Sequence, residues 1–194
     1  MYGRAMRWLL IFGPFLMNAA LAVPVRYSLD TTHSRIAFYV NHLGFSNALG
    51  ELKMPAGSFA FDATDWSKSS IEARIAVKTL DLGDLDWNTH VLGTDFLSVD
   101  TYPWITFVST SLEKTDAAQG KLLGNLTIRG VTKPVALDLH LNKSGEHPMR
   151  RVQAVGFTAT TTIKRSDFGI KAYLPLVGDD LDVRIEIEAF VANP

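Results

Sequence analysis

The sequence predicts an all-β domain whose strands form an antiparallel meander, closed as a barrel or packed as a sandwich. Two observations predict this fold class. Beyond Val23, apolar residues recur mainly with a period of two, which gives each strand one buried and one solvated face. Turn-forming residues such as Gly145 and Gly178-Asp179 separate these runs without long helical segments between them, as is typical of antiparallel connections.

Four stretches show the alternation most clearly, namely 36–41, 71–78, 135–142 and 183–191. In the first, Ile36, Phe38 and Val40 share one face of the expected strand. Weaker candidates for strands are 57–62, 103–112, 121–128 and 152–165. We therefore expect about eight strands, or nine, within one domain.

The segment from Asp84 to Ser98 departs from the period of two. Its apolar residues Leu85, Val91, Leu92 and Phe96 are spaced as on a short helix or helical turn. Asp84 or Asp86 can cap such a helix, because a carboxylate accepts hydrogen bonds from the free backbone N–H groups of the first turn.

Composition excludes several classes of protein. The chain has 194 residues, of which 47% are hydrophobic and 20% charged, which is typical of a folded domain. Its 19 Lys and Arg residues face 20 acidic ones, with a net charge of −1 and no basic run, so a nucleic-acid partner is not expected. Without cysteine the chain has no disulfides, thiolate metal sites or Cys nucleophile.

Residues 1–22 have the pattern of a cleaved signal peptide. Arg4 and Arg7 precede a short apolar run that Gly13-Pro14 interrupts, and Ala20-Leu21-Ala22 is a cleavage pattern. The run is shorter than the ~20 residues of a membrane-spanning helix, although an uncleaved signal anchor is the competing interpretation. We expect residues 23–194 to form the exported domain, in a bacterial periplasm.

Chemistry that would indicate an enzyme or a metal site is not evident. The five histidines have no paired-ligand spacing, and there is no G-x-S-x-G nucleophile motif. The acidic cluster Asp81, Asp84 and Asp86 does not fit a calcium-binding EF-hand loop and is explained by a helix cap. We predict no catalytic residue, no metal and no resident cofactor.

The interior of a barrel of about eight strands is either filled by side chains or wide enough for one small ligand. In 154–163, Ala154, Gly156 and the threonines at 158, 160 and 162 lie opposite a face with Val155 and Phe157. These small residues either open space inside the barrel or merely accommodate large neighbours. The polar segment Arg165–Gly169 follows this strand and is interpreted either as a structural turn or as a rim for a polar headgroup.

A series of motifs in the chain resembles the YceI-like family. The motifs are Tyr27–Asp30, His33–Phe38, Asn41–Gly44, His90–Leu92 with Asp95-Phe96, Tyr102–Phe107, Gly124–Val135, Arg165–Gly169 and Val177–Asp179. The resemblance implies a lipocalin-like barrel, usually exported, that binds polyisoprenoids or similar long apolar molecules and has no established catalytic residue. Some members occur beside or fused to b-type cytochromes. The sequence departs from the family at Trp87-Asn88-Thr89 and at Leu97.

The leading hypothesis is therefore an exported carrier with a polyisoprenoid, quinone-like or fatty ligand inside a barrel. The side chains expected to line its apolar cavity are Phe38, Val40, Phe59, Phe61, Phe96, Ile105, Phe107, Phe157 and Phe168. His42, Arg165 and Asp167 are expected at the rim, next to the headgroup.

Two alternatives stay open at this point. The first is an accessory protein that handles quinone for a membrane b-type cytochrome. The second is an enzyme acting on an apolar substrate, with His42, His90, Asp95 or Arg165 at the rim. A homodimer through an exposed strand edge is also open, because unpaired strand edges favour pairing.

Overall fold

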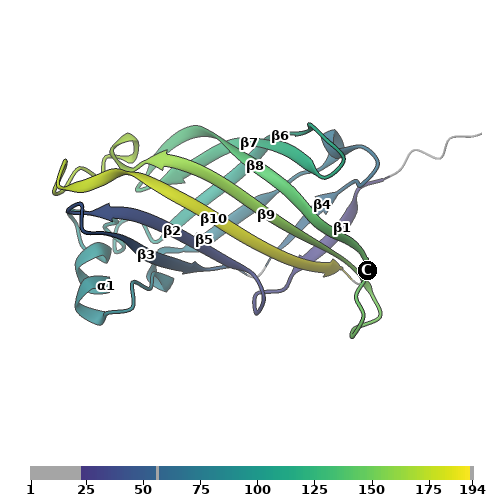
Figure 1. The fold of residues 1–194 in the computed structure, drawn as a ribbon, viewed down its shortest axis with the longest axis horizontal. Coiled ribbons are helices and arrows are strands. Elements are labelled where there is room, and N and C mark those ends of the chain that lie inside the picture. The colour runs from purple at the N-terminus through teal and green to yellow at the C-terminus, as the bar shows by residue number, and fades with distance from the viewer. Residues whose placement is uncertain (1–22, 56, 193–194) are drawn as a thin grey trace, which may run out of the picture.

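The computed structural model describes residues 23–55 and 57–192, and this part of the chain forms ten strands, one α-helix and three 3₁₀ turns (Figure 1). The strands are β1 (Val25–Leu29), β2 (Arg35–His42), β3 (Ser46–Lys53), β4 (Ser58–Phe61), β5 (Glu72–Ala76), β6 (Trp104–Lys114), β7 (Gln119–Ile128), β8 (Val131–Glu146), β9 (Gln153–Lys164) and β10 (Val177–Val191). The helix is α1 (Leu85–Leu92), and the turns are η1 (Trp66–Lys68), η2 (Val77–Thr79) and η3 (Arg165–Phe168).

All strands belong to one antiparallel sheet that curls into a barrel (Figure 1). Its order is β3-β2-β10-β9-β8-β7-β6-β5, and β1 joins β10 to β4. The long β10 pairs with β2 along its first part and with β1 near its end. Two isolated backbone bridges, Glu51 with Asp81 and Ala60 with Ser70, connect β3 and β4 to the segments on either side of β5. The all-β, lipocalin-like fold class is confirmed.

The eight stretches predicted as strands are all present, and β1 and β3 are two more. β3 pairs residue by residue with β2, from Arg35 opposite Lys53 to His42 opposite Ser46. Its side facing the interior carries Ala48, Gly50 and Leu52, so two of three inward positions are small. This is why the alternation of β3 is weak in the sequence.

The predicted helix is confirmed over Leu85–Leu92 and ends before the expected limit at Ser98. The Asp84 carboxylate caps it, accepting a hydrogen bond of 2.9 Å from the backbone N–H of Trp87. Turns follow the helix and place Phe96 in the protein core, where the side chain is buried.

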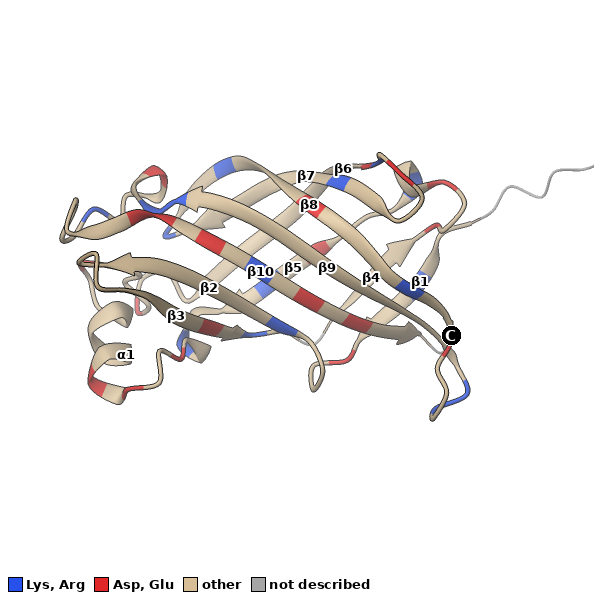
Figure 2. Ribbon diagram, in the orientation of Figure 1, with Lys and Arg blue, Asp and Glu red and all other residues tan. Residues whose placement is uncertain are grey.

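The threonines at 158, 160 and 162 of β9 face outward, so they do not open space in the barrel, whereas Thr161 lines the cavity. Thr158 donates a hydrogen bond to Glu186, and Thr162 donates one to Asp182, both on the outer face of the neighbouring β10. Val155, Phe157 and Ala159, on the opposite face of the strand, are buried inside. Charged residues also alternate with uncharged ones along β10 (Figure 2), as expected for a strand with one solvated face.

The predicted signal peptide, residues 1–22, lies outside the described residues and stays a prediction. Across residues 23–55 and 57–192, none of the helices has the length and apolarity needed to span a bilayer.

Candidate ligand-binding cavity

The barrel encloses a cavity of about 230 Å³ between two clusters of core side chains. All ten strands contribute to its wall, and within the described part of the chain the surface exposed to the cavity is entirely apolar. Such a wall offers no hydrogen bond to a ligand, so it can retain only an apolar group at low cost, because a buried polar group without a partner is destabilising. The cavity is therefore suited to hydrocarbon.

Seven of the nine residues predicted for the apolar cavity lie in its wall. They are Phe38, Phe59, Phe61, Ile105, Phe107, Phe157 and Phe168. The other two lie outside it. Val40 is half-buried, beyond Phe38 toward the end of β2, and Phe96 packs in the core against His90 and Tyr173, with ring centroids 5.2 and 6.0 Å away. Contact of any of the nine with a ligand stays a prediction.

Much of the wall is aliphatic, and the sequence-based selection of mainly aromatic residues missed it. The missed side chains on three long strands include Leu122, Leu126, Leu137, Leu139, Val183, Ile185 and Ile187. The period of two had already placed Leu137 with Leu139, and Val183 with Ile185 and Ile187, on common faces. The alternation was therefore sufficient to find the missed residues of β8 and β10 once the inward face of each strand was known.

Two glycines allow aromatic rings to lie close to the barrel wall. Gly50 on β3 pairs with Phe38 on β2, and a Cβ atom at position 50 would overlap the Phe38 ring. On the opposite hairpin, a Cβ at Gly124 of β7 would overlap the ring of Phe107 on β6. Each ring thus occupies space next to the wall that a side chain at the glycine position would otherwise fill. The rings therefore extend less far into the centre of the barrel.

Arg165 is the one predicted rim residue that lines the cavity, and it is buried rather than exposed, with 4% of its surface accessible. Its guanidinium donates three hydrogen bonds, from Nε to Gly178 O at 2.8 Å, from Nη1 to Ile170 O at 3.2 Å and from Nη2 to Val177 O at 2.9 Å. Burial lowers the pKa of Arg165 from its ordinary value.

The carbonyls bound by Arg165 belong mainly to an irregular start of β10. The register with β2 shifts between Val177 and Leu181, so this stretch is a bulge. Gly178 lies in the bulge and carries no side chain, and Arg165 ties the bulge to η3. The side chain of Arg165 therefore acts first as a structural clamp at this end of the cavity.

Asp167 and His42 do not line the cavity. Asp167 is exposed, and the carboxylate that binds η3 is Asp179, which accepts hydrogen bonds of 2.9 and 2.7 Å from N and Oγ of Ser166. Burial alone would raise the pKa of Asp179, but the bonds from Ser166 and the charges of Lys164 and Arg165 lower it overall. His42 is half-buried, with its ring 5.8 Å from Trp87 of α1.

A second group of polar residues lies at the opposite end of the barrel, beside an open cleft of about 360 Å³. Asp30, His33 and Glu188 offer three metal-ligating atoms within 4.8 Å of one another. The buried Asp30 carboxylate already contacts His33 Nδ1 at 2.9 Å and Arg150 Nη2 at 3.5 Å. The ion pairs explain the group, and a cation would have to displace them. Sequence reasoning noted His33 but not its partners.

Residues 27–189 match the family model described as the YceI-like domain. This chain belongs to the YceI-like family. The curated relatives include a "UPF0312 protein" of Shewanella sp. (strain W3-18-1), which is 35% identical over 182 residues, covering 89% of this chain and 94% of the relative. The resemblance inferred from the motifs is confirmed.

Two solved structures support the fold of this YceI-like protein. BcnA of Burkholderia cenocepacia is 24% identical with a TM-score of 0.74, over 82% of this chain and 98% of BcnA. A polyisoprenoid-binding domain from Saccharophagus degradans, implicated in plant cell wall breakdown, is 13% identical with a TM-score of 0.64, over 87% and 99% of the two chains. At these identities the likeness concerns the architecture.

Proposed function

We propose that this YceI-like protein is an exported carrier that holds a long apolar molecule, such as a polyisoprenoid, a quinone-like lipid or a fatty chain, inside its barrel. The observation that carries the proposal is the apolar cavity of about 230 Å³ inside the barrel. The S. degradans domain, which has the same architecture, is described as polyisoprenoid-binding, and this agrees with the proposed ligand class.

Burial of hydrocarbon supplies the binding free energy in this proposal. Each methylene removed from water contributes ~0.8 kcal/mol, so a five-carbon isoprene unit contributes roughly 4 kcal/mol before the costs of ordering the chain. Arg165 has its Nε and both Nη atoms bonded to carbonyls, so its part is to hold the wall rather than to supply most of the affinity.

The size of the cavity limits how much of a ligand fits without rearrangement. Its 230 Å³ lies below the roughly 300–1,000 Å³ of most small-molecule sites. A long chain therefore has to move side chains such as Phe38 and Leu97, which line the cavity and are only partly buried, or extend out of the barrel. We propose that uptake widens the cavity.

Export rests on the pattern of residues 1–22, and the periplasm is the proposed compartment. A b-type cytochrome partner and a homodimer stay predictions. For the enzyme alternative, the described residues include no hydrogen bond or ion pair among His42, His90, Asp95 and Arg165. The carrier function is therefore the better supported one.

A pair of substitutions on β9 tests the carrier function. Ala159 is buried and lines the cavity, whereas its neighbour Thr160 faces solvent. Ala159→Leu adds bulk inside the barrel and should lower the uptake of a radiolabelled prenyl alcohol of about 20 carbons at least tenfold, while Thr160→Leu should leave uptake unchanged. Equal uptake by both folded variants would contradict binding in the cavity.

A further inference from the structure

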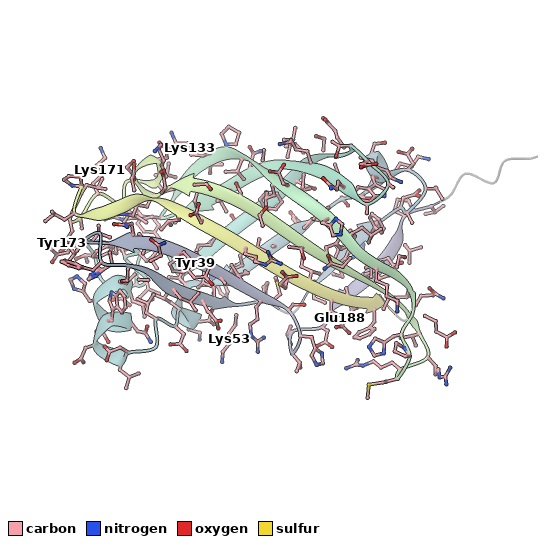
Figure 3. The ribbon with its side chains drawn as sticks, in the orientation of Figure 1. Tyr39, Lys53, Lys133, Lys171, Tyr173 and Glu188 are labelled. Carbon is pink, nitrogen blue, oxygen red and sulfur yellow. The ribbon has the colours of Figure 1, made fainter. Side chains whose placement is uncertain are left out.

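Large apolar side chains are exposed at the tips of the segments at one end of the barrel. The turn between β2 and β3 carries Leu43 and Phe45, which are 47% and 92% exposed. The connection between η3 and β10 carries Tyr173 and Leu176, which are 56% and 65% exposed. Figure 3 shows Tyr173 at the extreme end of the molecule, on the side of α1.

These two segments are held together by the backbone. Leu43 N donates a hydrogen bond of 3.1 Å to Leu176 O, and His42 pairs with Val177 across the sheet. The exposed side chains therefore lie on two adjoining segments, and we call these four residues the apolar tip (Leu43, Phe45, Tyr173 and Leu176). A cross-strand pair on the outer face of the same hairpin, Tyr39 with Leu49, is also exposed, 43% at each residue, and extends the apolar character beyond the turn.

The apolar tip is connected to the cavity through the chain itself. Phe168 and Ile170 line the cavity, and Tyr173 and Leu176 follow them in the same connection. A movement of this connection would therefore affect both the tip and the cavity wall. The tip and part of the cavity wall therefore belong to one continuous segment.

The two segments that form the apolar tip carry positive but no negative side-chain charge, which is compatible with an anionic surface. Residues 42–46 and 170–177 contain no acidic residue, and they include Lys171. Lys171 and Lys133 lie at this end of the barrel (Figure 3), and among the described residues neither has a carboxylate within ion-pair distance. Two of the neighbouring acids are engaged, since Asp180 pairs with Lys164 at 2.8 Å and Asp179 binds Ser166. Asp167 in η3 and Asp95 beside Phe96 are exposed and lie on the flanks of the two tip segments.

We propose that the apolar tip docks onto the surface of a lipid bilayer that contains anionic lipids. Phe45, Leu43 and Leu176 enter the boundary between headgroups and acyl chains, Tyr173 lies at the headgroup level, and the free lysines face lipid phosphates. The docked barrel presents its cavity to the membrane, which is the source and acceptor of a water-insoluble ligand. This last step rests on the proposed carrier function, whereas docking itself does not.

Vesicle binding tests the proposal. The protein is expressed from its full gene, purified as its host processes it, and its N-terminus is established by intact mass. It is then sedimented with vesicles of phosphatidylcholine and phosphatidylglycerol. The test variant is Phe45→Ser/Leu176→Ser, and the matched control is Met149→Ser, which removes an apolar side chain 87% exposed in the β8–β9 loop at the opposite end.

We expect the wild type and Met149→Ser to bind vesicles equally. The double variant should bind at least about tenfold more weakly, because burial of one such side chain is already worth a tenfold step in affinity. Binding should also weaken in high salt and on vesicles of phosphatidylcholine alone. Circular dichroism establishes that both variants are folded.

The proposal would be overturned if the wild type did not bind vesicles, or if the wild type and the double variant bound them equally. It would also be overturned if light scattering showed a dimer that the double substitution abolishes, with no vesicle binding by either protein. The last result would assign the tip to a second copy of the chain. Lipid extraction from each variant separates this proposal from the carrier function. Docking without any bound lipid would contradict the carrier function alone, and bound lipid without docking would contradict this inference alone.

Discussion

The ring of Phe38 on β2 occupies the space that a side chain at Gly50 on β3 would need. The two residues are direct cross-strand partners on the inner face of the first hairpin, and Phe38 is part of the cavity wall. A similar close approach occurs between Phe107 on β6 and Gly124 on β7, which are diagonal rather than direct cross-strand neighbours. The free volume of the barrel therefore depends on pairs of an aromatic residue and a glycine that lie on neighbouring strands.

Gly50→Ala should reduce the cavity. The added methyl group overlaps the Phe38 ring, which has to turn toward the centre of the barrel. We expect weaker uptake of a prenyl alcohol and a cost in stability of about 1–3 kcal/mol, as for other overpacked cores. Gly57→Ala is the control, because its new Cβ would meet only Leu29 Cδ1 at 3.8 Å. Calorimetric titration of both variants checks this, and equal affinities would contradict it.

Arg165→Met should destabilise the fold strongly. The substitution keeps the length of the apolar stem but removes the donors of three hydrogen bonds to Val177, Gly178 and Ile170. Bonds from a charged donor are worth about 1.5–3 kcal/mol each, so the free energy of unfolding should fall by at least about 3 kcal/mol. Arg184→Met, which breaks only an exposed ion pair with Glu186, should cost about 1 kcal/mol or less. Urea unfolding of both variants measures this difference, and similar losses would contradict the structural role of Arg165.

Acidification should destabilise the protein partly through Asp30. The hydrogen bond from the His33 side chain lowers the pKa of this carboxyl below its ordinary value near 4, assisted by the backbone N–H groups of Thr32 and His33. A carboxyl with a lowered pKa in the folded state stabilises the fold above its unfolded pKa, and this contribution is lost as the pH falls through the folded pKa.

Asp30→Asn should therefore flatten the dependence of the unfolding free energy on pH between about pH 5 and pH 2. The amide oxygen can still accept the backbone hydrogen bond that Thr32 N donates to Asp30, so the turn is retained. Urea midpoints measured across this range provide the comparison. A variant that loses stability on acidification as steeply as the wild type would show that Asp30 does not carry the effect.

The sequence was sufficient to predict the fold class, eight strands, the capped helix and most of the aromatic wall. These features depend on local periodicity, as with Ile36 and Phe38 on one face, or on a local cap such as Asp84. β3 escaped prediction because its inward positions include Ala48 and Gly50, which give little apolar contrast. The inward face of β9 also needed the structure, since both of its faces carry apolar or small residues.

The position of Arg165 could not be predicted from its residue type. A charged side chain in a turn suggests exposure, but this one is buried because carbonyls of a distant bulge at Val177 and Gly178 accept its hydrogen bonds. Similarly, the partnership of Gly50 with Phe38 depends on the register of β2 and β3. Long-range register and bulges are tertiary properties, so a single sequence does not reveal them.

The central claim is that the barrel carries a long apolar molecule in its cavity. Native mass spectrometry of the protein purified from its own host, followed by organic extraction and lipid analysis, tests it most directly. We expect a stoichiometric apolar adduct on the wild type that is depleted in Ala159→Leu and retained in Thr160→Leu. A folded wild-type protein that is empty and also refuses added prenyl lipids would contradict the claim.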